Sequence, residues 1–331
     1  MERCAVIELS SGYNPCLAPK TAFLFPGQGS QFAGMGKALA ETFPAARRVF
    51  EEADETLGFA LSRLCFEGPD DQLKLTENTQ PALLTVSVAA LAVLQEKGLS
   101  PDFVAGHSLG EYSALVAAGS LKFADAVKLV RNRGRYMQEA VPAGVGAMAA
   151  ILKLPEGKLE GVPAQAAQGE TVSAANLNTP EQVVIAGHAG AVGRAIDLAK
   201  AAGARRGVLL PVSAPFHCAL MKPAQERLRA DFDAAEFREL TCPLVNNWQA
   251  AEVRTGAEAR EGLYQQVPNP VRWVESVRYL VAQGIVRCVE VGAGGVLTGL
   301  LKGIDPSLAG LRFGNPGELA AVESKEYGPK V

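Results

Sequence analysis

The sequence lacks a cysteine framework, paired metal ligands and an excess of either charge. Its six cysteines include no Cys-x-x-Cys pair, and the chain has three histidines. We therefore expect a reduced protein with no disulfide framework and no metal site. The 32 basic and 35 acidic residues leave a formal net charge of -3. This balance gives no reason to expect nucleic acid as a partner, although a local basic patch could still bind an acidic protein.

Long apolar runs and targeting signals are also missing. The charge-free stretch from Pro81 to Leu94 is too short to span a bilayer and is typical of a buried core helix. Near the N-terminus, Glu8 interrupts the apolar residues before a signal peptide could form. We expect a cytoplasmic protein with no membrane partner, in which residues 1–20 form an N-terminal extension.

Hydrophobic residues are abundant enough to build a large core. They make up 48% of the 331 residues, and charged residues 20%, which excludes a disordered chain. Short apolar segments that alternate with helical patterns indicate an α/β fold with a parallel sheet. Strands are expected at 21–25, 103–105 and 286–291, and helices at 34–40, 45–57, 80–97, 124–141, 219–236 and 272–282.

The segment 145–212 has a different pattern. Strands are expected at 146–152, 172–177, 182–186 and 207–212, with helices within 155–168 and at 189–202. This order, β-α-β-β-α-β, is the ferredoxin-like order. We therefore predict a small domain at 145–212, inserted into a large domain made of 21–144 and 213–310. Residues 311–331 are predicted to form a C-terminal tail.

A candidate nucleophile lies between a predicted strand and a predicted helix. Gly106-His107-Ser108-Leu109-Gly110 matches the pattern G-x-S-x-G, whose glycines permit a sharp turn that lifts the serine above the sheet. The amide that follows the serine can then stabilise an oxyanion. An ordinary turn serine is the alternative, but the strand-turn-helix context favours Ser108 as a nucleophile.

A nucleophilic serine needs a base, and the histidines are few. His107 is the neighbour of the serine and is expected to point elsewhere, and His188 is expected in a surface loop of the small domain. Elimination leaves His217 as the base. No acidic residue stands out as the third member of a triad. A backbone carbonyl can also accept from the second ring nitrogen, so a Ser-His dyad is possible.

The helix predicted at 124–141 carries a charge on its apolar face. Arg133 falls in the middle of the stripe formed by Ala126, Val130, Met137 and Val141, opposite a polar face of Lys128, Arg131, Arg135 and Gln138. A buried guanidinium is costly unless it is paired, so an internal salt bridge is one interpretation. The other is that Arg133 grips the free carboxylate of a dicarboxylic acyl substrate.

Together, these motifs and several others resemble the malonyl-CoA:acyl carrier protein transacylases of fatty acid synthesis. The resemblance runs from Phe25 to about Lys302. Its motifs are Phe25-Pro26-Gly27-Gln28-Gly29-Ser30-Gln31, Thr79-Gln80-Pro81-Ala82, Gly106 to Tyr112, Arg133-Gly134, Met137-Gln138, Asn176-Leu177-Asn178, Pro215-Phe216-His217, Gln266, Asn269-Pro270-Val271 and Val291-Gly292 through Leu297.

The resemblance implies an α/β-hydrolase-like domain with a ferredoxin-like insert, and it implies catalytic roles. Ser108 would be acylated, and His217 would be its base. The backbone amides of Gln28 and Leu109 would form the oxyanion hole. The backbone carbonyl of Gln266 would orient His217, which would explain the missing acid.

The resemblance also implies which residues bind the substrate. Arg133 would hold the malonyl carboxylate. Gln80, Asn176 and Asn178 would line the site or order nearby loops, although amides that cap turns are an equal alternative. Phe216, next to the base, would crowd a branched acyl group such as methylmalonyl.

The implied reaction is ping-pong transfer of malonyl from malonyl-CoA to the phosphopantetheine thiol of acyl carrier protein. It needs no metal and no cofactor, and the resemblance suggests a monomer. Three alternatives remain at this point. The same residues could serve a serine thioesterase or hydrolase, or a trans-acting acyltransferase of a polyketide synthase. A catalytically inactive module that binds carrier protein is less compatible with an intact Ser108, His217 and Arg133.

Overall fold

A computed structural model describes residues 19–155, 157–159, 161–212 and 214–324. The larger of its two sheets has six strands in the order β10-β9-β1-β2-β7-β8. Neighbouring strands are parallel except for the β7–β8 pair. The strands are β1 (Lys20–Phe25), β2 (Phe103–Gly106), β7 (Leu244–Val245), β8 (Glu252–Val253), β9 (Ile285–Val291) and β10 (Ala309–Phe313).

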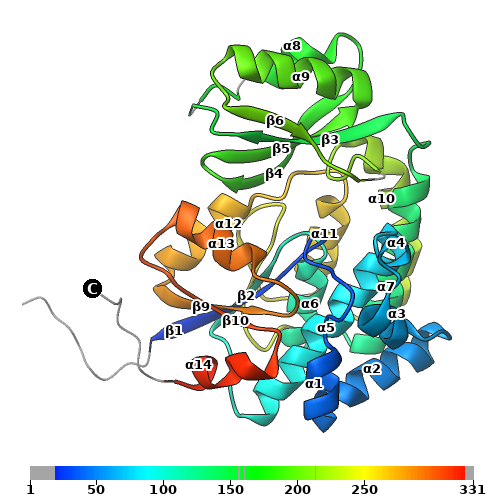
Figure 1. Ribbon diagram of the computed structural model, residues 1–331, viewed down its shortest axis with the longest axis vertical. Helices are drawn as coiled ribbons and strands as arrows, with labels where there is room; N and C mark the ends of the chain where they lie inside the picture. Colours follow the sequence, from blue (N-terminus) through cyan, green and yellow to red (C-terminus); the bar gives the residue numbers. More distant parts are fainter. Residues whose placement is uncertain (1–18, 156, 160, 213, 325–331) are drawn as a thin grey trace, which may run out of the picture.

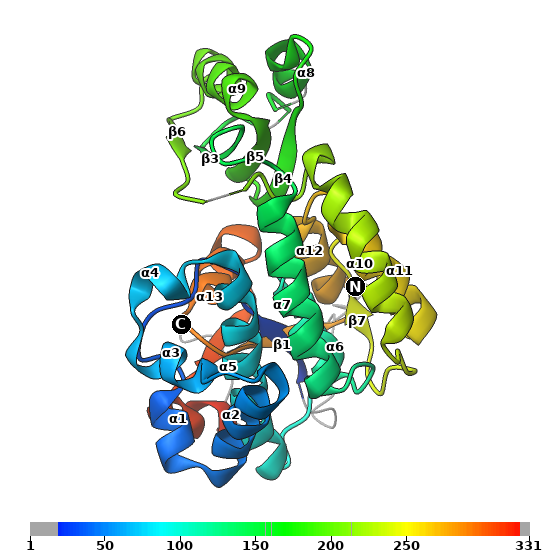
Figure 2. The ribbon, with the colours of Figure 1, turned by 90° about the vertical axis from the view of Figure 1, so that its right-hand side faces the viewer.

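Helices cover both faces of this sheet (Figures 1 and 2). They are α1 (Lys37–Thr42), α2 (Pro44–Leu57), α3 (Leu61–Glu67), α4 (Asp70–Leu73), α5 (Thr76–Glu96), α6 (Gly110–Ala117), α7 (Phe123–Glu139), α10 (Lys222–Ala234), α11 (Gly256–Gln266), α12 (Trp273–Ala282), α13 (Val296–Ile304) and α14 (Leu319–Glu323), with short 3-10 helices at Ala219–Met221 and Pro316–Glu318.

Strand β1 shows why both faces are covered. Phe23 and Phe25 belong to the apolar cluster that includes α5 and α7, whereas Ala22 and Leu24 belong to the cluster that includes α12 and α13. Successive side chains of a strand point to opposite faces, so a strand that is apolar at every position must be buried on both sides. This arrangement confirms the predicted α/β fold with a parallel sheet.

The second sheet is antiparallel and forms a separate small unit, seen at the top of Figure 1. Its strand order is β4-β5-β3-β6. Helices α8 and α9 share one apolar cluster with its strands. The elements are β3 (Gly146–Leu152), α8 (Val162–Ala167), β4 (Val172–Thr179), β5 (Gln182–His188), α9 (Ala189–Ala201) and β6 (Arg206–Leu209), which confirms the predicted order of strands and helices.

The small unit is joined to the large one through β4. The amide of Leu177 donates to the carbonyl of Val271 at 2.9 Å, and the amide of Val271 donates to the carbonyl of Ala175 at 2.8 Å. These two bonds extend strand pairing from one unit onto the loop before α12. They fix Asn176 and its neighbours relative to the large sheet.

The predicted C-terminal tail at 311–331 is wrong at its start. Residue 311 lies inside β10, which pairs with β9, and Phe313 is fully buried. Strand β10 is at the edge of the sheet, and its exposed positions alternate with half-buried ones before Phe313, so its apolar signal is weak. Helix α14 follows, whereas residues 325–331 lie outside the described residues, as do residues 1–18 of the predicted N-terminal extension.

The stretch Pro81–Leu94 is the middle of α5, and nearly all of it is buried, as expected for a core helix. Within the described ranges, no helix combines the length and apolar character that crossing a membrane requires. The cysteines at 65, 218, 242 and 288 are free thiols.

Candidate active site

Ser108 lies at a sharp turn between β2 and α6. Its φ angle is 53°, in the left-handed region that residues other than glycine rarely occupy. A Cβ at Gly106 would lie 1.9 Å from the carbonyl carbon of Gly110, and a Cβ at Gly110 would lie 2.0 Å from the carbonyl oxygen of Phe25. Only glycine fits at either position. The strand-turn-helix geometry predicted for the G-x-S-x-G segment is therefore present.

His217 is hydrogen-bonded to Ser108. The distance from Ser108 Oγ to His217 Nε2 is 2.6 Å. His217 Nδ1 lies 3.0 Å from the carbonyl oxygen of Gln266 and 3.2 Å from that of Asn269. Because a carbonyl oxygen only accepts, Nδ1 must carry the hydrogen, which leaves Nε2 free to accept from the serine hydroxyl. Two backbone carbonyls thus occupy the place of a triad acid.

The environment keeps the imidazole of His217 neutral. Its side chain is buried and, like Ser108, it has a positive φ, of 58°. Burial, followed by the nearby positive charge of Arg133, lowers the pKa of His217 to about 3. A neutral imidazole is the form that can accept a proton.

Arg133 is buried beside this pair, on the apolar face of α7 where the sequence predicted it. Its Nη1 donates to Gln80 Oε1 at 2.8 Å, and its Nη2 donates to Gln266 Oε1 at 2.9 Å and to Ser108 Oγ at 3.2 Å. Its guanidinium carbon lies 5.5 Å from the centre of the Tyr112 ring. The hydrogen-bond acceptors that Arg133 finds among the described residues are thus neutral oxygens, and its Nε has none.

This set of partners argues against the internal salt bridge. Burial lowers the pKa of Arg133, since a charged group loses its hydration there. A cation at 1% exposure with neutral acceptors is a site for an anion that enters with the substrate.

The Ser-His pair and Arg133 line one pocket, together with side chains from both units. Except for Asn178 and Gln266, every predicted site residue lines it. The small unit contributes Met148, Leu210 and Val212, which were not predicted, as well as Asn176. The complete lining is Gln28, Gln80, His107, Ser108, Leu109, Arg133, Met137, Met148, Asn176, Leu210, Val212, Phe216 and His217.

His107 is closer to the site than the sequence suggested. It lines the pocket, but its ring contacts Asn178 and Trp273, and His217 is the partner of Ser108, as predicted. His107 Nε2 lies 2.9 Å from Asn178 Oδ1, and the centre of its ring lies 5.5 Å from the centre of the Trp273 ring. Asn178 therefore binds the small unit to the turn that carries the nucleophile.

Two further polar residues touch the site and were not predicted. Asn247 Oδ1 accepts from the amide of Ser108 at 2.7 Å. Glu111 Oε2 accepts from the amide of Asn247 and from Gln266 Nε2, both at 2.9 Å. Asn247 follows β7, and ligand sites of parallel sheets lie beyond the carboxyl ends of the strands. Its position after a strand was therefore the signal that could have identified it. Glu111 is the one charged residue of α6.

Comparison with known proteins places the chain in a family. The model of the acyl transferase domain family matches residues 22–303. The malonyl CoA-acyl carrier protein transacylase of Bacillus subtilis strain 168 is 51% identical over 310 residues, which are 93% of this chain and 98% of that protein.

Solved structures agree. The acyl carrier protein S-malonyltransferase of Vibrio cholerae is 48% identical, with a TM-score of 0.90 over 92% of this chain and all of that one. A malonyl-transacylase in complex with its type II PKS acyl-carrier protein is 46% identical, with a TM-score of 0.89 over 91% of this chain and 98% of that one. With its nucleophile turn, its buried base and this degree of similarity, the chain belongs to the acyl transferase domain family.

Proposed function

We propose that this protein transfers malonyl from malonyl-CoA to the phosphopantetheine thiol of acyl carrier protein, through an ester on Ser108, in fatty acid biosynthesis. The observation that carries the proposal is Arg133, a buried cation with neutral acceptors that lies beside the Ser108–His217 pair. A malonyl group has a free carboxylate for this cation, and an acetyl group has none. The names of the Bacillus and Vibrio relatives support the same activity.

In the first half-reaction, His217 Nε2 takes the proton of Ser108 as Oγ attacks the thioester carbon. The backbone amides of Leu109 and Gln28, both at the pocket, stabilise the oxyanion. The carbon–sulfur bond then breaks. The proton passes from His217 to the coenzyme A sulfur, which leaves malonyl-Ser108.

The second half-reaction reverses these roles. The carrier thiol gives its proton to His217, and its sulfur attacks the ester carbonyl. The bond to Ser108 Oγ breaks, and Oγ recovers the proton. Every proton and leaving group is accounted for by the two residues and the two thiols, so the proposal uses no metal and no redox cofactor.

The pocket wall supports a preference for the unbranched malonyl group. Phe216, next to the base in sequence, lines the pocket together with Met148 and Leu210 from the small unit. A methyl branch on the substrate would meet this ring, at a cost of about 1–3 kcal/mol.

We also propose the finer domain description. The large unit would be an α/β-hydrolase-like catalytic domain, and the small unit at 145–212 a ferredoxin-like domain. The order β4-β5-β3-β6, with both helices packed in one cluster, supports the second name. The large domain is extended from residue 310 to include β10 and α14.

The test is transfer of labelled malonyl from malonyl-CoA to phosphopantetheinylated carrier protein, with acetyl-CoA in parallel. We expect labelled carrier with malonyl and little with acetyl. Release of free malonate without labelled carrier would identify a thioesterase instead. Comparing a fatty acid carrier with a type II polyketide carrier, the kind of partner in one solved relative, would decide the pathway.

The pH dependence of Ser108 acylation tests the assignment of the base. We expect kcat/KM for malonyl-CoA to stay level through pH 6.5, the ordinary pKa of a histidine, and to fall only well below it. The reason is that the lowered pKa of His217, about 3, keeps the imidazole neutral until the pH approaches that value.

The profile would be measured from neutral pH down to the lowest pH at which the circular dichroism spectrum is unchanged. Burial raises the pKa of Glu111 to about 7, so Glu111→Gln is the control that removes its titration. A loss of activity centred near pH 6.5 that persists in this variant would contradict the assignment.

A further inference from the structure

Glu111 is a buried carboxylate that the proposed mechanism does not use. It lies in the first turn of α6, three residues after the nucleophile, and is 1% exposed. The hydrogen bonds found for its carboxylate come from neutral donors, the amide of Asn247 and the side chain of Gln266. Both reach the same oxygen, Oε2. A buried carboxylate is costly, and the nearby positive charge of Arg133 opposes this cost without outweighing it, since burial still raises the pKa of Glu111.

The side chain of Gln266 connects Glu111 to Arg133. Its Nε2 donates to Glu111 Oε2 and to the carbonyl of Ser108, each at 2.9 Å, and its Oε1 accepts from Arg133 Nη2. An amide has one donor end and one acceptor end. If this amide turned over, its NH₂ group would face the guanidinium and its oxygen would face the carboxylate. Asn247 Oδ1 also lies 3.3 Å from this Nε2, so Glu111 is one of three acceptors that select the orientation holding Arg133.

The other donor to Glu111, Asn247, is held by many additional contacts. Its Oδ1 accepts from Ser108 N, and its Nδ2 donates to the carbonyl of Gly106 at 2.6 Å. Its own carbonyl accepts from the amide of Arg272 at 3.1 Å.

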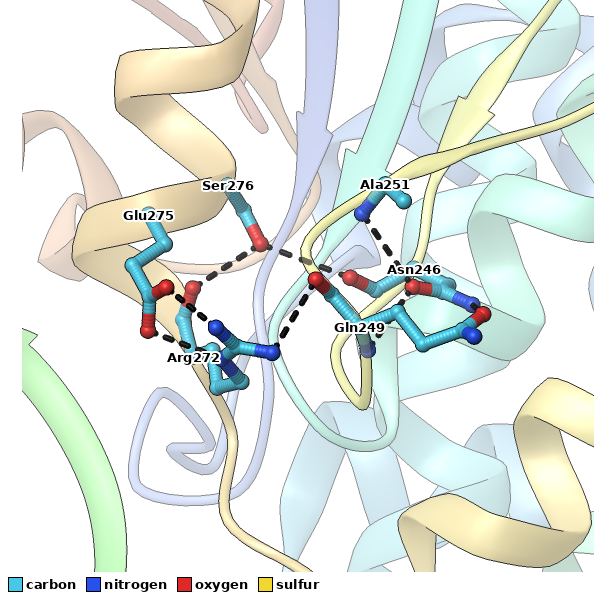
Figure 3. A network of polar contacts seen from close by, with 6 residues as sticks. All are labelled: Asn246, Gln249, Ala251, Arg272, Glu275 and Ser276. Atoms are coloured by element: carbon cyan, nitrogen blue, oxygen red, sulfur yellow. Dashed lines mark hydrogen bonds and ion pairs between the residues drawn. The ribbon is translucent and has the colours of Figure 1, made fainter.

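The loop from Asn246 to Ala251, which contains Asn247, is also hydrogen-bonded to the start of α12 (Figure 3). Ser276 Oγ donates to the carbonyl of Asn246 at 3.4 Å, and Arg272 Nη1 donates to that of Gln249 at 3.2 Å. Arg272 is in turn paired with Glu275. These contacts do not involve Glu111, so we infer that the effect of Glu111 on the site passes mainly through Gln266.

We propose that Glu111 is a positioning residue that acts through the Gln266 amide and holds the Arg133 guanidinium where it receives the free carboxylate of the acyl group. The proposal rests on the proposed function. It assigns to Glu111 an acceptor oxygen and not a charge, because one oxygen receives both hydrogen bonds. Loss of Glu111 should therefore reduce transfer of an acyl group with a carboxylate more than transfer of one without.

The experiment measures kcat/KM for Ser108 acylation by malonyl-CoA and by acetyl-CoA, and compares the ratio between variants. In Glu111→Ala we expect malonyl acylation to fall about 10- to 100-fold, the scale of a displacement of about 1 Å at a binding group, with a smaller loss for acetyl. Glu111→Gln keeps an acceptor oxygen and should restore the wild-type ratio.

A second variant tests the proposal even if Glu111→Ala does not fold. Gln266→Leu removes the amide but keeps the backbone carbonyl that holds His217, and it should give the same selective loss. In the double variant Glu111→Ala/Gln266→Leu the ratio should be no lower than in Gln266→Leu alone, because residues that act in series are not additive.

Equal losses for malonyl and acetyl would assign Glu111 a structural role and overturn the proposal. A ratio that falls in Glu111→Gln as far as in Glu111→Ala would overturn it too, because charge would then be the cause. These results are separate from a failure of the proposed function, which would appear in the wild-type protein as an absence of malonyl transfer to the carrier.

Discussion

Replacing Ser108 with alanine is expected to reduce malonyl transfer by roughly 10⁶-fold in kcat, the loss seen when a serine nucleophile of this type is removed. The turn places this hydroxyl within hydrogen-bond distance of both His217 and Arg133. Its loss removes the ester intermediate and leaves the pocket able to bind malonyl-CoA. Steady-state transfer measures the rate, and intact-protein mass spectrometry detects the malonyl-enzyme, which should be absent from the variant.

The exposed Ser100 provides the matched control, since Ser100→Ala makes the same chemical change far from the nucleophile turn in sequence. His217→Ala should be nearly as damaging as Ser108→Ala, and the double variant should be no worse than either, because the two residues act as a unit. Substantial transfer by Ser108→Ala, or an acyl adduct that persists in it, would rule out the covalent route.

The catalytic centre could be predicted from the sequence because each of its three main residues leaves a local signal. Ser108 lies between two glycines that must be glycines, since a Cβ at either would overlap backbone atoms. His217 is found by elimination among three histidines. Arg133 breaks the apolar stripe of a helix, and a periodicity of 3.6 residues is among the most reliable sequence patterns.

The groups that hold these residues in place could not be found in this way. The carbonyls of Gln266 and Asn269 that orient His217 are backbone atoms, which every residue has. The link from Glu111 to Arg133 depends on the rotamer of one amide, and no spacing rule encodes a rotamer. Gln266 was predicted for its carbonyl from family resemblance, whereas the role of its side chain required the folded structure.

The fold likewise contains elements that the sequence predicts and elements that it does not. Strand β3 was predicted with its observed bounds, because its apolar run is continuous and bounded by turns. Strands β7 and β8 have two residues each and were missed, and the last three residues of β10 were assigned to a tail. Strands this short are stabilised by the neighbours they pair with, and that contribution is tertiary.

Replacing Arg133 with alanine is expected to reverse the acyl preference. The variant loses the cation that would meet the malonyl carboxylate. Truncating one partner of a buried charge pair costs about 2–5 kcal/mol, roughly 30- to 5,000-fold in kcat/KM. Acetyl transfer should be spared or increased, since an acetyl group has no charge to pair with Arg133 and gains nothing from displacing its neutral acceptors. Parallel measurement of kcat/KM for malonyl-CoA and acetyl-CoA gives the ratio directly.

Two variants on the same helix separate charge from geometry. Arg135→Ala removes an exposed guanidinium two positions away and should change neither rate. Arg133→Lys keeps the charge but loses the planar guanidinium, which can donate two parallel hydrogen bonds to one carboxylate. We expect Arg133→Lys to fall between wild type and Arg133→Ala for malonyl. Equal losses of malonyl and acetyl transfer in Arg133→Ala, with the fold intact, would contradict the carboxylate clamp. The positive charge beside Ser108 would then serve the nucleophile for every acyl group.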